Sequence, residues 1–180
     1  MKCTALLAVI FCLAASSARA ETNPLLEEWK APFGAPPFDR IRNEHYAPAL
    51  REAMRLQREA IARIVADPAA PTFENTLEAI ERSGELLARV DNVFRAVNSA
   101  STSDEIEAIA RELAPEQSAH ADAILFDSGL FERIRKVYDA RNGLPLSPEQ
   151  RRLIEKRYRD FVRGGALLDR GGPGHRPGGI

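Results

Sequence analysis

Apolar residues recur at helical spacing after Thr72, and this pattern predicts a long helix around which the rest of the chain packs. Thr72 is a natural N-cap, because its hydroxyl can accept a hydrogen bond from a backbone N–H in the first turn. The helix is expected to run from Phe73 to about Asn98 with two neighbouring apolar stripes, which are Phe73, Leu77, Ile80, Leu87 and Phe94, and then Leu86, Val90, Val93 and Val97. Two stripes make a wide apolar arc, so we expect other helices to cover it on more than one side.

A first long helix is predicted before this central one, from Asn43 or His45 to Val65. Prolines in residues 67–71 end it and make a stiff link to the central helix. Because the link is short, we expect the two helices to pack antiparallel.

A polar break at residues 99–103 separates the central helix from the next one. Thr102 with Glu105 predicts a capping box at the start of this helix. Pro115 should interrupt it, because proline lacks the backbone N–H that a helix interior needs. A further helix is then expected as far as residues 127–129.

Two more helices are predicted near the C-terminus. One begins at Leu130-Phe131 and ends at Asn142-Gly143, where we expect a residue in the left-handed conformation. The other begins at Ser147-Pro148-Glu149-Gln150, a serine cap with proline in the first helical position and a glutamine that closes the box. Gly164-Gly165 should end it.

No stretch shows strand periodicity, so the predicted fold class is all-α. Residues 43–169 are expected to form an antiparallel helical bundle, preceded by an extended arm at residues 21–42. Prolines and a glycine at positions 32–37 rule out a regular helix in the arm. We expect three of its aromatic residues to be pinned to the helical body: Trp29, Phe33 and Phe38.

Residues 1–20 have the pattern of a secretory signal peptide. Lys2 precedes an apolar core, and Ala18-Arg19-Ala20 is a typical cleavage site. The apolar run is short for a membrane span, so no stable membrane anchor is expected after cleavage, and the mature chain should be periplasmic or secreted. Both cysteines, Cys3 and Cys12, fall within this segment, which leaves the mature chain without a disulfide or a thiolate ligand.

Charge excludes some classes of partner. Without residues 1–20 the chain has 23 basic and 26 acidic residues, a net charge of −3 with histidine neutral. Nucleic-acid binding depends on clustered lysine and arginine, and no such cluster is conspicuous in the sequence, so a nucleic-acid partner is not expected.

The candidate chemical residues favour structural roles. The three histidines are His45, His120 and His175, and no two of them are close enough in sequence to share a helix face as metal ligands. Packing or capping is the preferred role of His45 and His120, with contact to a metal or a substrate as the alternative. A catalytic triad of Ser118, His120 and Asp122 is disfavoured, because neighbours on one helix cannot converge on a substrate.

Two further positions have a structural and a functional interpretation. Glu74-Asn75 should serve the helix N-terminus, with contact to another domain as the alternative. Asp91 is expected at a boundary facing water, with a buried polar contact as the alternative. No catalytic, cofactor-binding or metal-binding residue is assigned.

Several of these elements, in this order and separation, carry a resemblance to a known family. They are the Thr72-Phe73-Glu74-Asn75-Thr76 helix start, His45-Tyr46-x-Pro48-Ala49 before it, Pro115 with His120 and Asp122, and Phe161-Val162-Arg163-Gly164-Gly165-Ala166. Over Asn23 to Asp169 the chain resembles the N-terminal region of the thimet-oligopeptidase-like family of zinc metallopeptidases.

The resemblance implies a peptidase of peptidyl-dipeptidase or oligopeptidase type, in which this region walls a channel that admits short peptides. The family's zinc site uses a helical H-E-x-x-H motif, which this sequence lacks. Zinc is therefore expected only in the full-length enzyme, whose catalytic half would be this chain's partner. The chain alone is expected to be inactive.

At Asp169 the family pattern stops, and residues 170–180 form a tail rich in glycine and proline. We expect a truncated or frame-shifted product with a non-family tail. The alternative is a stand-alone exported helical module that binds a peptide or protein without catalysis.

Overall fold

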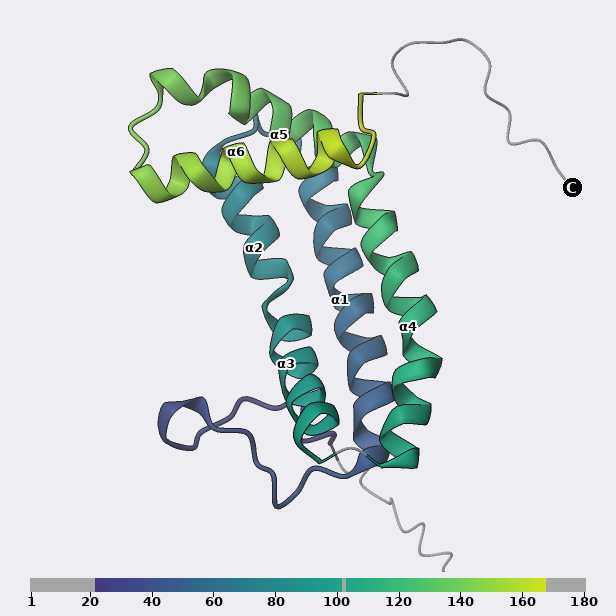
Figure 1. Cartoon of the computed structure of the whole chain (residues 1–180). Helices are drawn as coiled ribbons and strands as arrows, with labels where there is room; N and C mark the ends of the chain where they lie inside the picture. Colours follow the sequence, from purple (N-terminus) through teal and green to yellow (C-terminus); the bar gives the residue numbers. More distant parts are fainter. Residues whose placement is uncertain (1–21, 102, 168–180) are drawn as a thin grey trace, which may run out of the picture.

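A computed structural model describes residues 22–101 and 103–167 (Figure 1). All regular secondary structure in these ranges is helical, which confirms the predicted all-α class for them. The predicted signal peptide at 1–20 and the tail at 170–180 lie outside the described residues and stay predictions. None of the helices in the described ranges is long and apolar enough to cross a membrane.

The first long helix, α1, spans Tyr46–Ala66 after a short 3-10 turn, η2, at Asn43–His45. This agrees with the predicted helix to within about one residue. The link at residues 67–71 then reverses the chain, and the following helices pack along α1 as expected.

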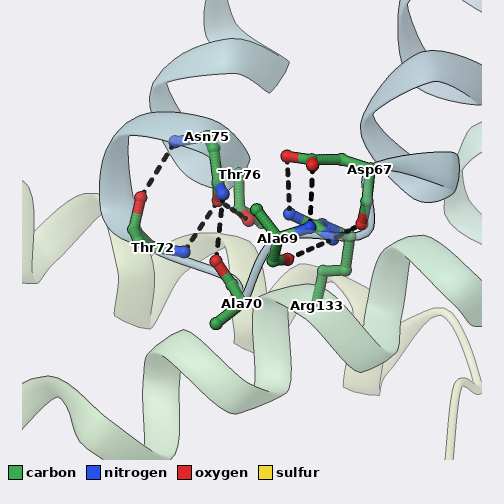
Figure 2. Close-up of polar contacts among 7 residues, drawn as sticks. All are labelled: Asp67, Ala69, Ala70, Thr72, Asn75, Thr76 and Arg133. Atoms are coloured by element: carbon green, nitrogen blue, oxygen red, sulfur yellow. Dashed lines mark hydrogen bonds and ion pairs between the residues drawn. The ribbon is translucent and has the colours of Figure 1, made fainter.

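The cap at Thr72 is confirmed. Its Oγ1 accepts from the backbone N–H of Asn75 at 3.1 Å, and Asn75 Oδ1 accepts from the backbone N–H of Thr72 at 2.7 Å (Figure 2). The first turns are a π-helix, η3, at Phe73–Glu78, and the side chain of Thr76 within it is fully buried.

The central helix is not continuous, which corrects the sequence prediction. It consists of η3, α2 at Ala79–Ser83 and α3 at Glu85–Ala100, with a break at Gly84. Gln57 on α1 lies close to this position, since its Nε2 would be 3.0 Å from a Cβ at Gly84. The missing side chain lets α1 approach the helix backbone closely.

The helix α4 spans Asp104–Leu125 without interruption, so the prediction that Pro115 divides it was wrong. Its buried residues, Ile106, Leu113 and His120, are seven positions apart and therefore share one face on both sides of the proline. Packing along this face holds the helix together despite the lost hydrogen bond. Its N-cap is Ser103, whose Oγ accepts from Ile106 N at 3.3 Å. Thr102, on which the predicted capping box rested, lies outside the described residues.

The last two helices are α5 at Ser128–Ala140 and α6 at Pro148–Arg163. The capping box at Ser147 is confirmed, with Gln150 N donating to Ser147 Oγ at 3.2 Å and Ser147 N to Gln150 Oε1 at 2.8 Å. As predicted, α6 ends at two glycines, and Gly165 has a positive φ of 100°.

The expected left-handed residue at the end of α5 is absent. A 3-10 turn, η4, follows at Arg141–Gly143, and Gly143 has no positive φ. Arg151 on α6 donates to the carbonyls of Arg141 at 2.9 Å and Leu144 at 3.1 Å. Within the last turn of α5, Arg141 Nη1 donates to Tyr138 O at 2.6 Å, so a side chain satisfies one of the terminal carbonyls.

The helices form two parts. Figure 1 shows α1, α2–α3 and α4 side by side, with α5 and α6 lying across one end of them. One core, the hairpin core, joins α5 and α6 to α1, η3 and α2: Ile61, Ile64, Phe73, Leu77, Ile80, Leu130, Phe131, Ile134, Val137, Ile154 and Phe161. A second core joins the arm to α1, α3 and α4: Leu25, Ile41, Tyr46, Ala49, Leu50, Val90, Val93, Phe94, Ile106 and Leu113.

The N-terminal arm is pinned by fewer aromatic residues than predicted. Trp29 packs against the second core, with its Nε1 donating to Pro24 O at 3.0 Å. Phe33 and Phe38 are instead exposed. Residues 32–41 form local turns through backbone hydrogen bonds among themselves, including the 3-10 turn η1 at Pro32–Gly34.

Candidate functional site

A cleft of about 740 Å³ lies where α6 meets α2, α3 and α4, within the 300–1,000 Å³ that is usual for ligand sites. Its lining is mostly apolar, and the break at Gly84 forms part of it. The apolar lining residues are Ile80, Leu87, Ala88, Ala121, Ile124, Leu125 and Phe161, and the polar ones are Gln57, Glu81, Glu85, His120, Arg157 and Asp160.

His120 lies in this cleft and links α4 to α1. The residue is buried, its Nε2 is 2.7 Å from Gln57 Oε1, and its Nδ1 is 3.2 Å from Arg58 Nη1. A guanidinium can only donate, so Nδ1 accepts and the Nε2–H donates to Gln57. Burial, and then the charge of Arg58, lower the pKa of His120, so the ring is neutral at pH 7.

A charged pair forms one edge of the cleft. Arg157 on α6 donates from Nε to Glu81 Oε1 on α2 at 2.7 Å. The pair is partly exposed, so its contribution to stability is modest. It nevertheless ties the α5–α6 hairpin to α2 beside the apolar lining.

The three residues of the disfavoured triad do not converge, in agreement with the sequence analysis. Ser118 and Asp122 are exposed, whereas His120 is buried and bonded to α1. His45 serves the start of α1, as expected, because its Nδ1 accepts from the backbone N–H of Arg42 at 3.0 Å. His175 lies outside the described residues. Within residues 22–101 and 103–167, no group of three histidine, cysteine or acidic side chains is arranged to hold a metal ion.

Asn75 serves the helix N-terminus, as its sequence position suggested. Asp91 lies at a boundary, as expected, with its side chain 20% exposed. It accepts from Arg95 Nε at 2.6 Å and from Gln117 Nε2 on α4 at 3.1 Å. The boundary side chain therefore also makes a polar contact between α3 and α4.

Sequence reasoning missed Arg133, which holds the link between α1 and η3. Figure 2 shows it reaching from α5 to this link, where Nη1 donates to Asp67 O at 2.8 Å and Ala69 O at 3.3 Å. Its Nη2 lies 3.4 Å from Asp67 Oδ2. One feature of the sequence could have pointed to it: Arg133 is a charged residue directly before Ile134, on the apolar face of a predicted helix.

Comparison with known proteins decides the relationship. The chain is 44% identical to a dipeptidyl carboxypeptidase of Salmonella typhimurium over 147 residues, which are 82% of this chain and 22% of that protein. The chain is homologous to the N-terminal region of the thimet-oligopeptidase family. The chain is also 41% identical to the dipeptidyl carboxypeptidase of Escherichia coli over 146 residues, which are 81% of this chain and 21% of that protein.

A more distant relative is an oligopeptidase. Oligopeptidase A of Escherichia coli is 30% identical over 147 residues, 82% of this chain and 21% of the relative. This chain thus spans about a fifth of the length of the relatives it matches. No protein-family profile matches the chain. The resemblance drawn from the sequence is confirmed.

Proposed function

We propose that the chain forms the N-terminal helical part of an exported zinc peptidase of peptidyl-dipeptidase or oligopeptidase type. The observation that carries this proposal is the 44% identity to a dipeptidyl carboxypeptidase over 82% of the chain. The complete enzyme would hydrolyse short peptides, and this part would form one wall of the channel that admits them.

The cleft beside His120 supports a role in such a wall. It is largely apolar and about 740 Å³ in volume, which suits the side chains of a short peptide or of an adjoining part of the enzyme. The hydrogen bonds of His120 are both directed to α1, so the ring holds the wall in place rather than reacting.

The residues of this chain do not fit a zinc site. The sequence contains three histidines, at 45, 120 and 175, and no H-E-x-x-H motif. Of these, His45 and His120 are each engaged in hydrogen bonds that shape a helix start or join two helices. We therefore propose that zinc and the catalytic groups belong to the part of the enzyme that this chain does not contain.

An assay of the purified chain tests whether the catalytic groups lie outside it. Fluorogenic oligopeptides would be incubated with the chain and zinc, and with the Salmonella dipeptidyl carboxypeptidase as a positive control. We expect no cleavage by the chain above the protein-free blank. Cleavage that a metal chelator abolishes would place a catalytic site in this chain and overturn the proposal.

Export is supported by the signal-like pattern of residues 1–20. The test is expression of a C-terminally tagged chain in a Gram-negative host, followed by fractionation and intact mass measurement. We expect a periplasmic product that begins at Glu21. An uncleaved product in the cytoplasmic fraction would contradict export.

A stand-alone exported binding module is the second candidate. It is favoured by the two cores, which every long helix of the described residues helps to build. Size-exclusion chromatography with thermal circular dichroism separates the two candidates. A monomer with a sharp transition favours the module, whereas a molten, dye-binding state favours a part that requires the rest of the enzyme.

A further inference from the structure

Charge is distributed very unevenly between the two parts of the fold. Residues 46–127, which include α1 to α4, contain eight basic and fifteen acidic side chains, a net charge of −7. Residues 128–167, which include α5 and α6, contain ten basic and five acidic side chains, a net charge of +5. The net charge of the whole chain, −1, hides this separation.

The basic side chains gather on the outer face of α6. Arg152, Lys156, Arg159 and Arg163 follow one another at intervals of four, three and four residues, so they form one stripe along the helix. All four are exposed, and they lie opposite the buried residues Ile154 and Phe161. At 1.5 Å per residue the stripe is about 16 Å long.

Most of this stripe is not neutralised. Lys156 pairs with Asp160 at 2.7 Å. Among the described residues, Arg152, Arg159 and Arg163 form no ion pair. Three guanidinium groups are therefore available to a ligand with carboxylates at matching spacing.

A hollow of about 320 Å³ lies beside the stripe, lined by Tyr138, Glu155, Tyr158, Arg159 and Val162. Arg159 belongs to both the stripe and the hollow. The hydroxyls of Tyr138 and Tyr158 form no hydrogen bond with described residues, so they can donate to an acceptor that enters. The lining therefore combines aromatic and apolar surface with one guanidinium and two hydroxyls, and Glu155 is its acidic residue.

The faces of the tyrosine rings are already occupied. Tyr138 stacks on Tyr158 at 3.9 Å, and the Arg141 guanidinium lies 3.7 Å from the Tyr138 ring centre. Two groups this close cannot share one face, so both faces of Tyr138 are covered. Nucleic-acid bases bind aromatic side chains by stacking on free faces, and Tyr138 offers none.

We propose that the α6 stripe and the hollow beside Tyr158 are a docking site for an acidic protein segment that carries one apolar anchor side chain. A segment of about five extended residues spans the stripe. Such a short segment stays on the basic hairpin, whereas a long nucleic acid or a membrane surface would also meet the acidic body. This inference does not depend on the proposed peptidase role.

The test measures the fluorescence anisotropy of a labelled acidic peptide as the full chain is added. The peptide has six glutamates around a central leucine. We expect binding that weakens about tenfold or more between 50 and 200 mM salt, since the contacts are charged. A peptide with lysine in place of glutamate should not bind. Replacing the leucine by serine should weaken binding several-fold, because the hollow then stays empty.

Three double variants provide a matched comparison. Arg152→Glu with Arg159→Glu should weaken binding about tenfold or more, while Arg82→Glu with Arg111→Glu makes the same charge change on the acidic body and should have less than about a twofold effect. The lysine double variant, Arg152→Lys with Arg159→Lys, should retain most of the binding. Circular dichroism checks that each variant is folded.

Three outcomes would overturn the proposal. One is no preference for the acidic over the basic peptide. Another is equal loss of binding in the two glutamate double variants. If a variant does not fold, the salt dependence of the unmodified chain tests the proposal independently. The third is tighter binding to single-stranded DNA or to anionic lipid vesicles than to the acidic peptide.

Discussion

His120 on α4 and Gln57 on α1 are joined by a 2.7 Å hydrogen bond across the floor of the cleft. The bond requires the neutral ring with its proton on Nε2, because Arg58 donates to Nδ1 from the other side. Protonation of Nδ1 would turn two donors toward each other. This contact between two long helices is therefore sensitive to pH.

Stability should depend on pH through His120. Its folded pKa lies below the ordinary value of 6.5, so the folded state binds fewer protons than the unfolded state. The contribution is fully present above pH 6.5 and is lost as the pH falls through the folded pKa. Urea unfolding of the unmodified chain should show a falling free energy of unfolding below pH 6.5.

Two substitutions check that His120 is responsible. His120→Gln should flatten the pH dependence in this window, although it lowers stability at pH 7. Ser118→Ala, at an exposed position on the same helix with no titratable side chain, is the control and should keep the slope of the unmodified chain. If both variants keep that slope, His120 is not the titrating group.

The two helix caps should each contribute measurable stability. Thr72→Ala removes the acceptor for Asn75 N, and Ser147→Ala removes the acceptor for Gln150 N. Each should lower the free energy of unfolding by about 1 kcal/mol in urea titrations. Ser118→Ala, at an exposed position within α4, is the control and should change it by less than about 0.5 kcal/mol. Equal effects at all three positions would argue against the caps.

Arg133 should matter much more than its neighbour Arg135. Its buried guanidinium holds the carbonyls of Asp67 and Ala69 in the link before η3. Arg133→Ala leaves those carbonyls without their donor and should cost about 2–4 kcal/mol of unfolding free energy. Arg135→Ala breaks a half-exposed pair with Glu132 and should cost less than about 1 kcal/mol.

A lysine at position 133 distinguishes hydrogen bonding from charge. Lysine keeps the charge but cannot present the planar, forked donors that reach two carbonyls. Arg133→Lys should therefore recover only part of the lost stability. Full recovery would mean that charge alone explains the effect.

Two glycines should respond oppositely to alanine. A Cβ at Gly164 would lie 2.6–3.0 Å from three carbons of Leu125, so Gly164→Ala should destabilise by about 1–3 kcal/mol through overpacking. A Cβ at Gly143 meets nothing within 4 Å. Gly143→Ala should be neutral or stabilise by up to about 1 kcal/mol. Thermal unfolding of both variants checks the contrast.

Local patterns predicted the fold where neighbouring residues decide it. The caps at Thr72 and Ser147 depend on residues three positions away, so the sequence displays both partners. The close approach of α1 at Gly84 and the continuity through Pro115 depend instead on packing between and along helices. No local pattern reveals that Gln57 approaches Gly84 from another helix.

The candidate site was less predictable for the same reason. His120 is bonded to residues 62 and 63 positions away, and Arg133 to residues 64 and 66 positions away. Such pairs are set by the packing of α1 against α4 and α5. The basic stripe on α6 was readable in principle, because its spacing lies within one helix, but whole-chain charge concealed it.

A chimeric enzyme tests most directly whether this chain is the N-terminal part of a peptidase. The stretch of the Salmonella dipeptidyl carboxypeptidase that matches 147 residues of this chain would be replaced by those residues, and the specific activity on a short peptide measured. We predict a folded chimera with activity within about tenfold of the parent, because a homologous wall should preserve the site. A folded chimera without activity, no better than one carrying an unrelated helical bundle, would contradict the account.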